Sequence, residues 1–360
     1  MVASGSGMSL LRPLIRRGPV PRARQELIAI CGIHVLLGVA CPILLSRLKE
    51  QHGGHYGFSV AALTFHVYMA AATVGFSCNA MHGKKGLLRL NAPGRVWRYG
   101  CTASLFSIGD MLSFLSLQHL DAGTFSLVGK ALGIVATVAL ARMILGKRHT
   151  SLQYVLVFSC AVATLVFCHV ERLAHPVPSA PPGPGLQTQS WRGSGELSLG
   201  LALRALAVTL SALATVLQER LLAQEPGCPF MLQQFWMSLG AVSTSLLVFR
   251  LLHGLPVAQL FEGFDDWRVA LVMVVHVAHG FSTGLVLKRI GALTKALCVP
   301  LNLGGCYICS VLMGTAALKM SAVLAWTVST SLMLAFALSK TPVISRMYAG
   351  DEKLQADSKV

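Results

Sequence analysis

The sequence predicts an all-α integral membrane protein of ten transmembrane helices, arranged as two inverted repeats of five helices each. Three observations lead to this fold class. The 360 residues are 54% apolar and only 12% charged, whereas an ordinary soluble domain carries roughly 25% charged residues. The apolar residues gather into ten runs of membrane-spanning length. One segment rich in proline and glycine divides these runs into five and five.

Each apolar run can cross a membrane as a helix. A run of about 20–25 residues, rising 1.5 Å per residue, spans a hydrocarbon core of ~30 Å. Turn-forming sequences such as Ala92-Pro93-Gly94 separate the runs, and the short joins at 120–122 and 288–292 predict antiparallel hairpins. The predicted spans are residues 26–46, 58–81, 98–119, 122–145, 151–171, 197–222, 229–252, 267–287, 293–314 and 319–339.

Basic residues predict how the bundle is oriented. The formal net charge is +16, and the basic residues lie at the ends of the apolar runs, which disfavours nucleic acid as a partner and indicates topological bias. Residues 1–25 hold five arginines and no acid, whereas the opposite connections carry acids such as Glu262 and Asp265. The positive-inside rule then places the tails 1–25 and 340–360 in the cytosol, as an even number of spans requires.

The long connection 172–196 is predicted to be a flexible linker, because it holds the sequence Pro181-Pro182-Gly183-Pro184-Gly185. It separates a first repeat, 26–171, from a second repeat, 197–339. An odd number of spans in each half makes the second half enter the membrane with the opposite orientation. This is the arrangement of an inverted repeat, which lets a carrier alternate access to a site at the midplane.

Two ionisable residues stand inside apolar spans. A lysine at the centre of a span costs about 2.5–3.5 kcal/mol on insertion scales, so it usually faces a cavity or a partner. Lys130 lies between Gly129 and Gly133 in the fourth run. It is predicted either to bind a phosphate of the cargo or to pair with Asp110 of the third run. Asp110 could balance Lys130 or contact a polar part of the cargo.

Further candidates lie towards the ends of the spans. Lys288 and Arg289 fit the positive-inside pattern, whereas Lys295 comes after the turn and could point into the bundle, which makes it the better site candidate. Glu219 could belong to the site or pair with its neighbour Arg220 at the helix end.

Amide side chains complete the predicted site. Gln233 and Gln234 in the seventh run could contact a sugar or a base edge, and Asn302 follows Pro300, where a freed carbonyl and an amide could line a cavity. The histidines of the spans lack metal-ligand spacing, so neither a metal nor another cofactor is expected. No acid–base motif indicates an enzyme, and a membrane transferase is the less favoured alternative.

Three stretches resemble the nucleotide-sugar transporter family of the drug/metabolite transporter superfamily. The sequence Leu120-Asp121-Ala122-Gly123-Thr124-Phe125, followed by Lys130 and by Leu152-Gln153-Tyr154, is similar to the family's Leu-Asp-Ala-Ala-Thr-Tyr, lysine and Leu-Gln-Trp pattern. Glu219-Arg220-Leu221-Leu222 resembles its Glu-Lys-Leu-Leu segment, and Lys288 and Lys295 keep the spacing of its two-lysine motif. Asp110 and Gln233-Gln234 depart from the family pattern, which has an asparagine and an Arg-Asn pair there.

The resemblance implies an antiporter of the Golgi or endoplasmic reticulum membrane. Such a protein exchanges a cytosolic nucleotide sugar, here with a UDP-sugar favoured, for a lumenal nucleoside monophosphate. It also implies phosphate contacts for Lys295 and Lys130. Gly291-Ala292-Leu293-Thr294-Lys295 resembles GDP-mannose carriers, so a GDP-sugar or a phosphorylated metabolite stays as an alternative cargo. Homo-oligomerisation is compatible with this reading.

Overall fold

The computed structural model describes residues 20–51, 59–120, 122–174, 194–253, 260–314 and 316–339, and these residues contain helices but no strand. The predicted tail 340–360 and most of the predicted tail 1–25 and linker 172–196 lie outside the described residues.

All ten predicted apolar runs fall on helices, and eight described segments are long and apolar enough to cross a membrane. The protein is therefore a multi-pass membrane protein. The two remaining long helices, α4 and α8, are not among these eight. The long helices are α1 (Val20–Gln51), α2 (Val60–Ala80), α4 (Pro93–His119), α5 (Ala122–Leu145), α6 (Ser151–Ala174), α7 (Ser194–Gln224), α8 (Phe230–His253), α9 (Trp267–Arg289), α11 (Val299–Leu312) and α12 (Met320–Ser339).

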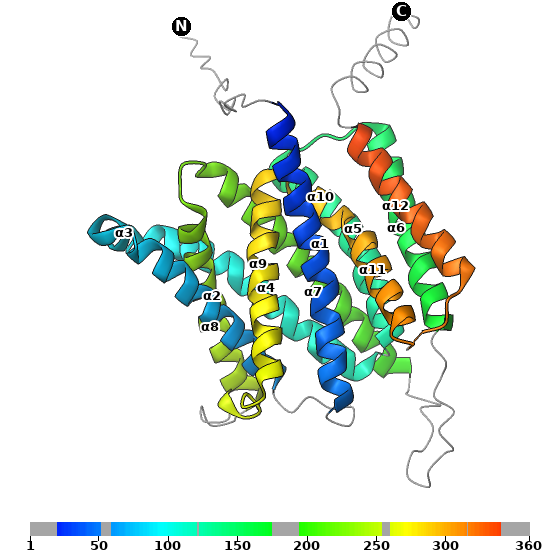
Figure 1. Cartoon of the computed structure of the whole chain (residues 1–360), viewed down its shortest axis with the longest axis horizontal. Helices are drawn as coiled ribbons and strands as arrows, with labels where there is room; N and C mark the ends of the chain where they lie inside the picture. Colours follow the sequence, from blue (N-terminus) through cyan, green and yellow to red (C-terminus); the bar gives the residue numbers. More distant parts are fainter. Residues whose placement is uncertain are drawn as a thin grey trace, which may run out of the picture.

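Two short helices interrupt this series. α3 (Gly83–Leu90) lies between α2 and α4, at the outer edge of the bundle (Figure 1). α10 (Ala292–Leu297) precedes α11, and the two together cover the predicted ninth span. The ninth span is thus a broken helix, because Pro300, in the first turn of α11, has no N–H to continue the hydrogen bonding of α10.

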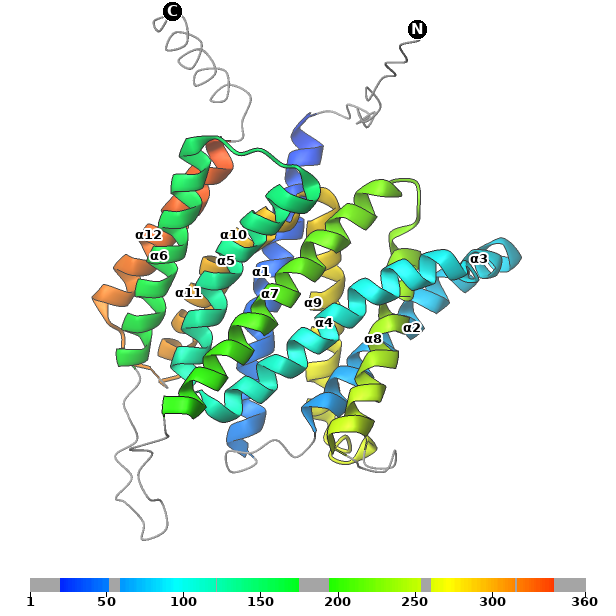
Figure 2. The ribbon, with the colours of Figure 1, turned by 180° about the vertical axis from the view of Figure 1, so that it is seen from behind.

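The halves of the chain pack mainly against each other. The most extensive contacts between helices pair α4 with α7 and α2 with α8, and others pair α5 with α7, α1 with α9, and α6 with α12. These pairs recur when each long helix is replaced by the one at the same place in the order of the other half, so that α1 and α7, α4 and α9, and α5 and α11 change places. The α4–α7 pair then becomes α9–α1, and the α5–α7 pair becomes α11–α1. Figures 1 and 2 show the resulting bundle from its two sides.

The first and last described helices identify the two ends of the bundle. α1 begins and α12 ends at the same end of the bundle, at the top of Figure 1, whereas α6 ends and α7 begins at the opposite end. We call these the terminal end and the linker end. This arrangement fits an even number of crossings.

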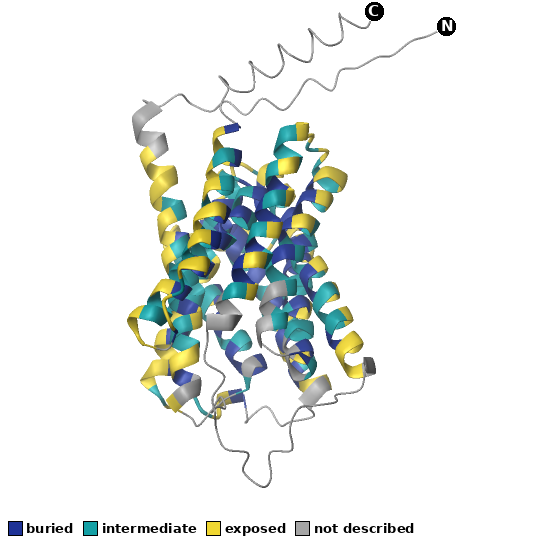
Figure 3. Ribbon diagram, turned by 90° about the vertical axis from the view of Figure 1, so that its right-hand side faces the viewer, coloured by how far each residue is buried: buried dark blue, intermediate teal, exposed yellow. Residues whose placement is uncertain are grey.

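Burial separates an interior from an apolar outer surface (Figure 3). Tyr99 and Trp236 are fully buried at the centre of the largest cluster, where α4 and α8 meet. Large apolar side chains face outwards on the long helices, with Leu36 70% and Phe158 65% exposed. A soluble protein rarely exposes so much contiguous apolar surface, and here lipid would cover it.

Close approach of α4 and α8 depends on Gly240. A Cβ added at Gly240 would overlap the backbone of Gly100, whereas a Cβ added at Gly100 would lie 3.5 Å from Cα of Gly240, at ordinary contact distance. Helices in membranes associate through such small residues because lipid offers little hydrophobic drive for helix pairing.

We therefore expect Gly240→Ala to destabilise the protein by about 1–3 kcal/mol through overpacking, while Gly100→Ala stays close to the parent. Thermal unfolding in detergent, followed by tryptophan fluorescence, measures both. Equal melting temperatures for the two variants would contradict the assigned contact.

Candidate functional site

A cavity of about 410 Å³ lies between the two halves of the chain. Residues of α1, α2 and α4 form its wall from the first half, and residues of α7, α8, α9 and α10 form its wall from the second. Much of the lining is apolar and aromatic, as in most small-molecule sites. The polar residues that line it are Thr64, Tyr68, Asp110, Gln218, Gln234, Ser238, His276, His279, Thr283 and Lys295. Three of the residues predicted for the site, Lys295, Asp110 and Gln234, are thus brought together.

Lys295 reaches the cavity from the broken ninth span. It lies in the short helix α10, before the break at Cys298. Its Nζ lies 5.8 Å from the centroid of the Phe106 ring of α4. Among the residues that the structure describes, Lys295 forms no direct ion pair. Broken helices commonly present charged and polar groups to the site in transporters.

Glu219 holds the start of α10 in place. Its Oε2 accepts a hydrogen bond from the Ala292 N–H at 3.0 Å, and its Oε1 pairs with Lys147 of the loop after α5. Gly291 adopts φ +104°, and a Cβ there would lie 2.5 Å from Glu219 Oε1, so only glycine fits. The predicted pairing of Glu219 with Arg220 is replaced by the pair with Lys147, because α7 brings the carboxylate beneath α10. Glu219 is not among the cavity-lining residues and acts as a positioning residue for α10.

Two cationic side chains influence Asp110. Lys295 and Arg204 both act on its carboxyl group electrostatically. Arg204 lies in α7, donates from Nη1 to Ser113 Oγ at 2.8 Å, and stacks on the Phe125 ring with 3.5 Å between Cζ and the ring centroid. Sequence analysis missed Arg204, although an arginine within an apolar run meets the same criterion that singled out Lys130.

Arg204 also explains a glycine beside Lys130. A Cβ at Gly129 would overlap the Arg204 guanidinium, so glycine leaves the space that the arginine occupies. Lys130 itself is partly buried and is not among the cavity-lining residues, but it acts electrostatically on His279, which lines the cavity.

Two histidines of α9 form part of the wall. His276 and His279 line the cavity. The His279 ring stacks on His34 of α1 with centroids 4.9 Å apart, and His34 Nδ1 lies 3.3 Å from Ser282 Oγ. These contacts join α1 to α9, and the described residues contain no group of three or more metal-ligating side chains.

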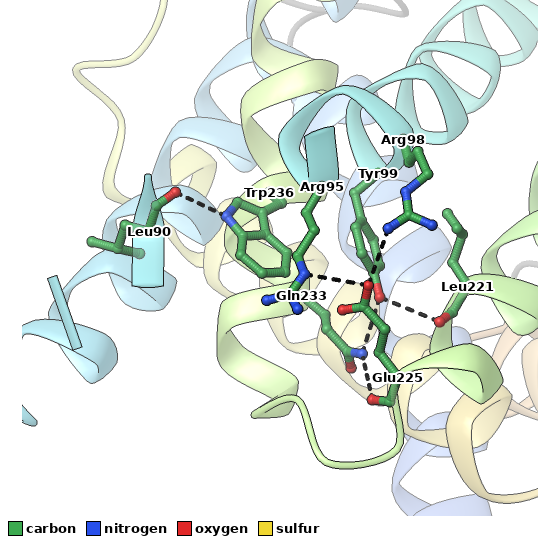
Figure 4. A network of polar contacts seen from close by, with 8 residues as sticks. All are labelled: Leu90, Arg95, Arg98, Tyr99, Leu221, Glu225, Gln233 and Trp236. Carbon is green, nitrogen blue, oxygen red and sulfur yellow. Dashed lines mark hydrogen bonds and ion pairs between the residues drawn. The ribbon is translucent and has the colours of Figure 1, made fainter. Parts of the chain in front are cut away.

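Lys288 and Gln233 belong to a different cluster. Lys288 Nζ donates to Gln233 Oε1 at 2.9 Å and to the Cys228 carbonyl at 3.1 Å. Gln233 Nε2 donates to the Tyr99 hydroxyl and to the Glu225 carbonyl (Figure 4). Neither residue lines the central cavity. Gln233 and Gln234 are adjacent in the sequence, which suggested a joint role for them. Successive residues of a helix, however, point in directions about 100° apart.

Asn302 lies apart from the other predicted site residues. It packs against Gly38 of α1, where a Cβ would meet Asn302 Nδ2 at 2.6 Å, and it is not among the cavity-lining residues. The break at Cys298 separates it from Lys295, so the two residues predicted from one span serve different interfaces.

We expect Lys288→Ala to lower the free energy of unfolding by about 1–3 kcal/mol, because it leaves Gln233 Oε1 and the Cys228 carbonyl without their donor. Arg289→Ala is the matched control, since Arg289 is the exposed next residue. Thermal unfolding of both variants in detergent tests this, and an unchanged Lys288→Ala protein would contradict the structural role.

Comparison with known proteins agrees with this architecture. A crystal structure of a protein aligns with a TM-score of 0.57 over 90% of this chain and 99% of that chain, at 18% identity, which shows a shared fold. Among curated proteins, none matches this chain. The sequence profile of the nucleotide-sugar transporter family matches residues 60–338, from α2 to the end of α12. The resemblance found in the sequence is confirmed, and the chain belongs to the nucleotide-sugar transporter family.

Proposed function

We propose that this protein exchanges a cytosolic nucleotide sugar for a lumenal nucleoside monophosphate, with Lys295 binding phosphate in the central cavity. Membership of the family supports the transport of nucleotide sugars. The observation that carries the site assignment is the position of Lys295, which borders a cavity between the two halves without a direct ion pair among the described residues. Its charge is therefore available to an anion.

The electrostatics of the cavity favour an anionic cargo. A nucleotide diphosphate sugar carries about two negative charges, which hydrocarbon alone would not accept. The charge of Asp110 is met by Lys295 and Arg204 together, so one acid faces two cationic groups, with Lys130 contributing a third cation near His279. The amides of Gln218 and Gln234 line the same cavity and can contact a base or a sugar.

The packing of the helices supports two inverted five-helix repeats. Each inter-half pair named above has its counterpart when the halves are exchanged, as expected when two similar units pack around a pseudo-two-fold axis in the membrane plane. A cavity bounded by both repeats can open towards either side when one repeat moves against the other.

Ion pairs join the two halves of the chain at the terminal end of the bundle. Glu225 of the second half forms ion pairs with two arginines of the first half, at 3.4 Å from Arg95 Nε and 3.3 Å from Arg98 Nη2 (Figure 4). Glu219 pairs with Lys147 in the same way. We infer that these ion pairs form a gate on the cytosolic side, where the positive-inside rule places both termini.

The base, the sugar and the membrane are part of the proposal. A UDP-sugar is favoured and a Golgi or endoplasmic reticulum membrane is expected from the family resemblance. The similarity of residues 291–295 to GDP-mannose carriers makes a GDP-sugar the second candidate. Uptake of labelled UDP-sugars, GDP-sugars and phosphorylated sugars by one proteoliposome preparation distinguishes these cargoes.

We expect Lys295→Ala to reduce nucleotide-sugar uptake by more than about tenfold, because a buried cation that meets a phosphate contributes strongly to binding. Uptake is measured in proteoliposomes that are preloaded with nucleoside monophosphate or left empty. Lys295→Arg keeps the charge and should retain part of the activity, and Arg289→Ala is the exposed control.

Wild-type uptake by Lys295→Ala would overturn the assignment of the site. Equal uptake by empty and preloaded vesicles would overturn exchange, while leaving transport of nucleotide sugars in place.

We expect Glu225→Gln to open the cytosolic gate more often, because the amide keeps the shape of the side chain but loses both ion pairs. The measurement uses Ala103→Cys, since Ala103 lines the cavity and is only 2% exposed. In sealed microsomes, a membrane-impermeant maleimide on the cytosolic face should label Cys at position 103 roughly two- to fivefold faster in the Glu225→Gln background.

Peptide mass spectrometry reports this position separately from the ten native cysteines. Glu262→Gln, which changes an exposed acid of an opposite connection, should leave the labelling rate unchanged. Equal rates in the Glu225→Gln and Glu262→Gln backgrounds would exclude the gate.

A further inference from the structure

We propose that a second cavity, between α3, the start of α4 and the α7–α8 connection, binds the phosphate-bearing headgroup of an anionic phospholipid. This cavity has a volume of about 380 Å³ and is bordered by Arg89, Arg95, Glu225 and residues 227–229. It shares no lining residue with the central cavity. It is therefore a separate site.

Positive charge exceeds negative charge around this cavity. Arg89 and Arg95 line it, and Arg98 binds the same Glu225 carboxylate as Arg95. Lys288 reaches it through its hydrogen bond to the Cys228 carbonyl. Burial and the nearby Glu225 raise the pKa of the Cys228 thiol, so this thiol stays neutral. Of the described residues that line the cavity, Glu225 is thus the one anionic group, whereas Arg89 and Arg95 are cationic, and Arg98 pairs with the same carboxylate from beside the cavity.

Topological bias alone does not account for this cluster. The positive-inside rule requires basic residues near the cytosolic surface, but it does not require them to converge on a cavity. Here the guanidinium of Arg95 lies 5.7 Å from the ring centroid of Trp236, whose Nε1 donates to the Leu90 carbonyl (Figure 4). Leu232, at the base of the cavity, is 1% exposed. Arg95 is thus held in position, and arginine pairs with phosphate through parallel hydrogen bonds.

The surroundings of the cavity favour a lipid as the source of the phosphate. Next to Arg89, Leu88 of α3 is 68% exposed, and Trp97 of α4 is 73% exposed. Lys84 and Lys85 of α3 are exposed as well. A short helix with exposed basic and apolar side chains is typical of the membrane–water interface, where tryptophan is also enriched. A headgroup in the cavity would leave its acyl chains beside these apolar side chains.

α3 packs closely against the end of α2. A Cβ at Gly86 would overlap the Asn79 carbonyl at the end of α2. Arg89, three residues further along α3, lines the cavity.

Binding of a headgroup in this second cavity would affect the ion pairs of Glu225 that form the proposed gate. Glu225 Oε1 forms the ion pairs with both arginines, whereas its buried Oε2 has no hydrogen-bond partner among the described residues. A phosphate that takes Arg95 from Glu225 would weaken the closing contact. This consequence rests on the proposed function, while the binding itself does not.

Binding of lipid to the purified full-length protein tests the proposal without any transport assay. Native mass spectrometry in detergent compares retention of dioleoyl-phosphatidylglycerol with that of dioleoyl-phosphatidylcholine. We expect the anionic lipid to be retained preferentially, and Arg89→Gln to weaken its apparent affinity by about fivefold. Arg89→Lys, which keeps the charge, should stay nearer the parent. Arg148→Gln, an exposed basic residue outside the cavity, should have no effect.

Three outcomes would overturn the proposal. Equal retention of the two lipids would exclude headgroup recognition by charge. Equal weakening by Arg89→Gln and Arg148→Gln would indicate general attraction instead of a site. Displacement of the lipid by inorganic phosphate or nucleoside monophosphate at micromolar concentration would assign the cavity to a soluble anion.

Discussion

Charge in the interior of a membrane protein must be balanced within the protein, and Lys295 and Asp110 meet this requirement across the central cavity. Lys295 comes from the second half of the chain and Asp110 from the first. The two groups interact without a direct ion pair among the described residues. Because Asp110 offsets only part of the positive charge of Lys295 and Arg204, the empty site is less strongly charged and can still attract an anion.

The gate and the site are linked through one carboxylate. Glu219 pairs with Lys147 of the first half and accepts a hydrogen bond from the first N–H of α10, the helix that carries Lys295. Movement of one half against the other would change the environment of Glu219. It would therefore reach Lys295, the residue proposed to bind phosphate, within about one turn of helix. Under the proposed function, this contact offers a route by which closure of the terminal end could affect occupancy of the cavity, since one side chain contacts both Lys147 and α10.

The terminal end of the bundle also contains the second cavity, with its cationic residues around Glu225. Its cations exceed its acids, and it is bordered by exposed apolar side chains of α3 and α4. An arginine shared between a carboxylate and a lipid phosphate would let the composition of the membrane influence how tightly the halves close. Such an effect needs only a difference in the affinity of the lipid for the closed and open states.

Much of the fold followed from sequence alone, because the length and apolar character of a span are set by the thickness of the bilayer. The runs, their separations and the candidacy of Lys295 and Asp110 could all be derived from the local order of residues. Which polar side chains share the cavity depended on the tertiary structure. Gln233 and Gln234 are adjacent in the sequence but point to different clusters, Glu219 binds Lys147 instead of its neighbour Arg220, and Arg204 reaches across to α4 and α5. Hydropathy records whether a residue lies in a span, whereas its partners are decided by the rotation and packing of helices that are distant in the chain.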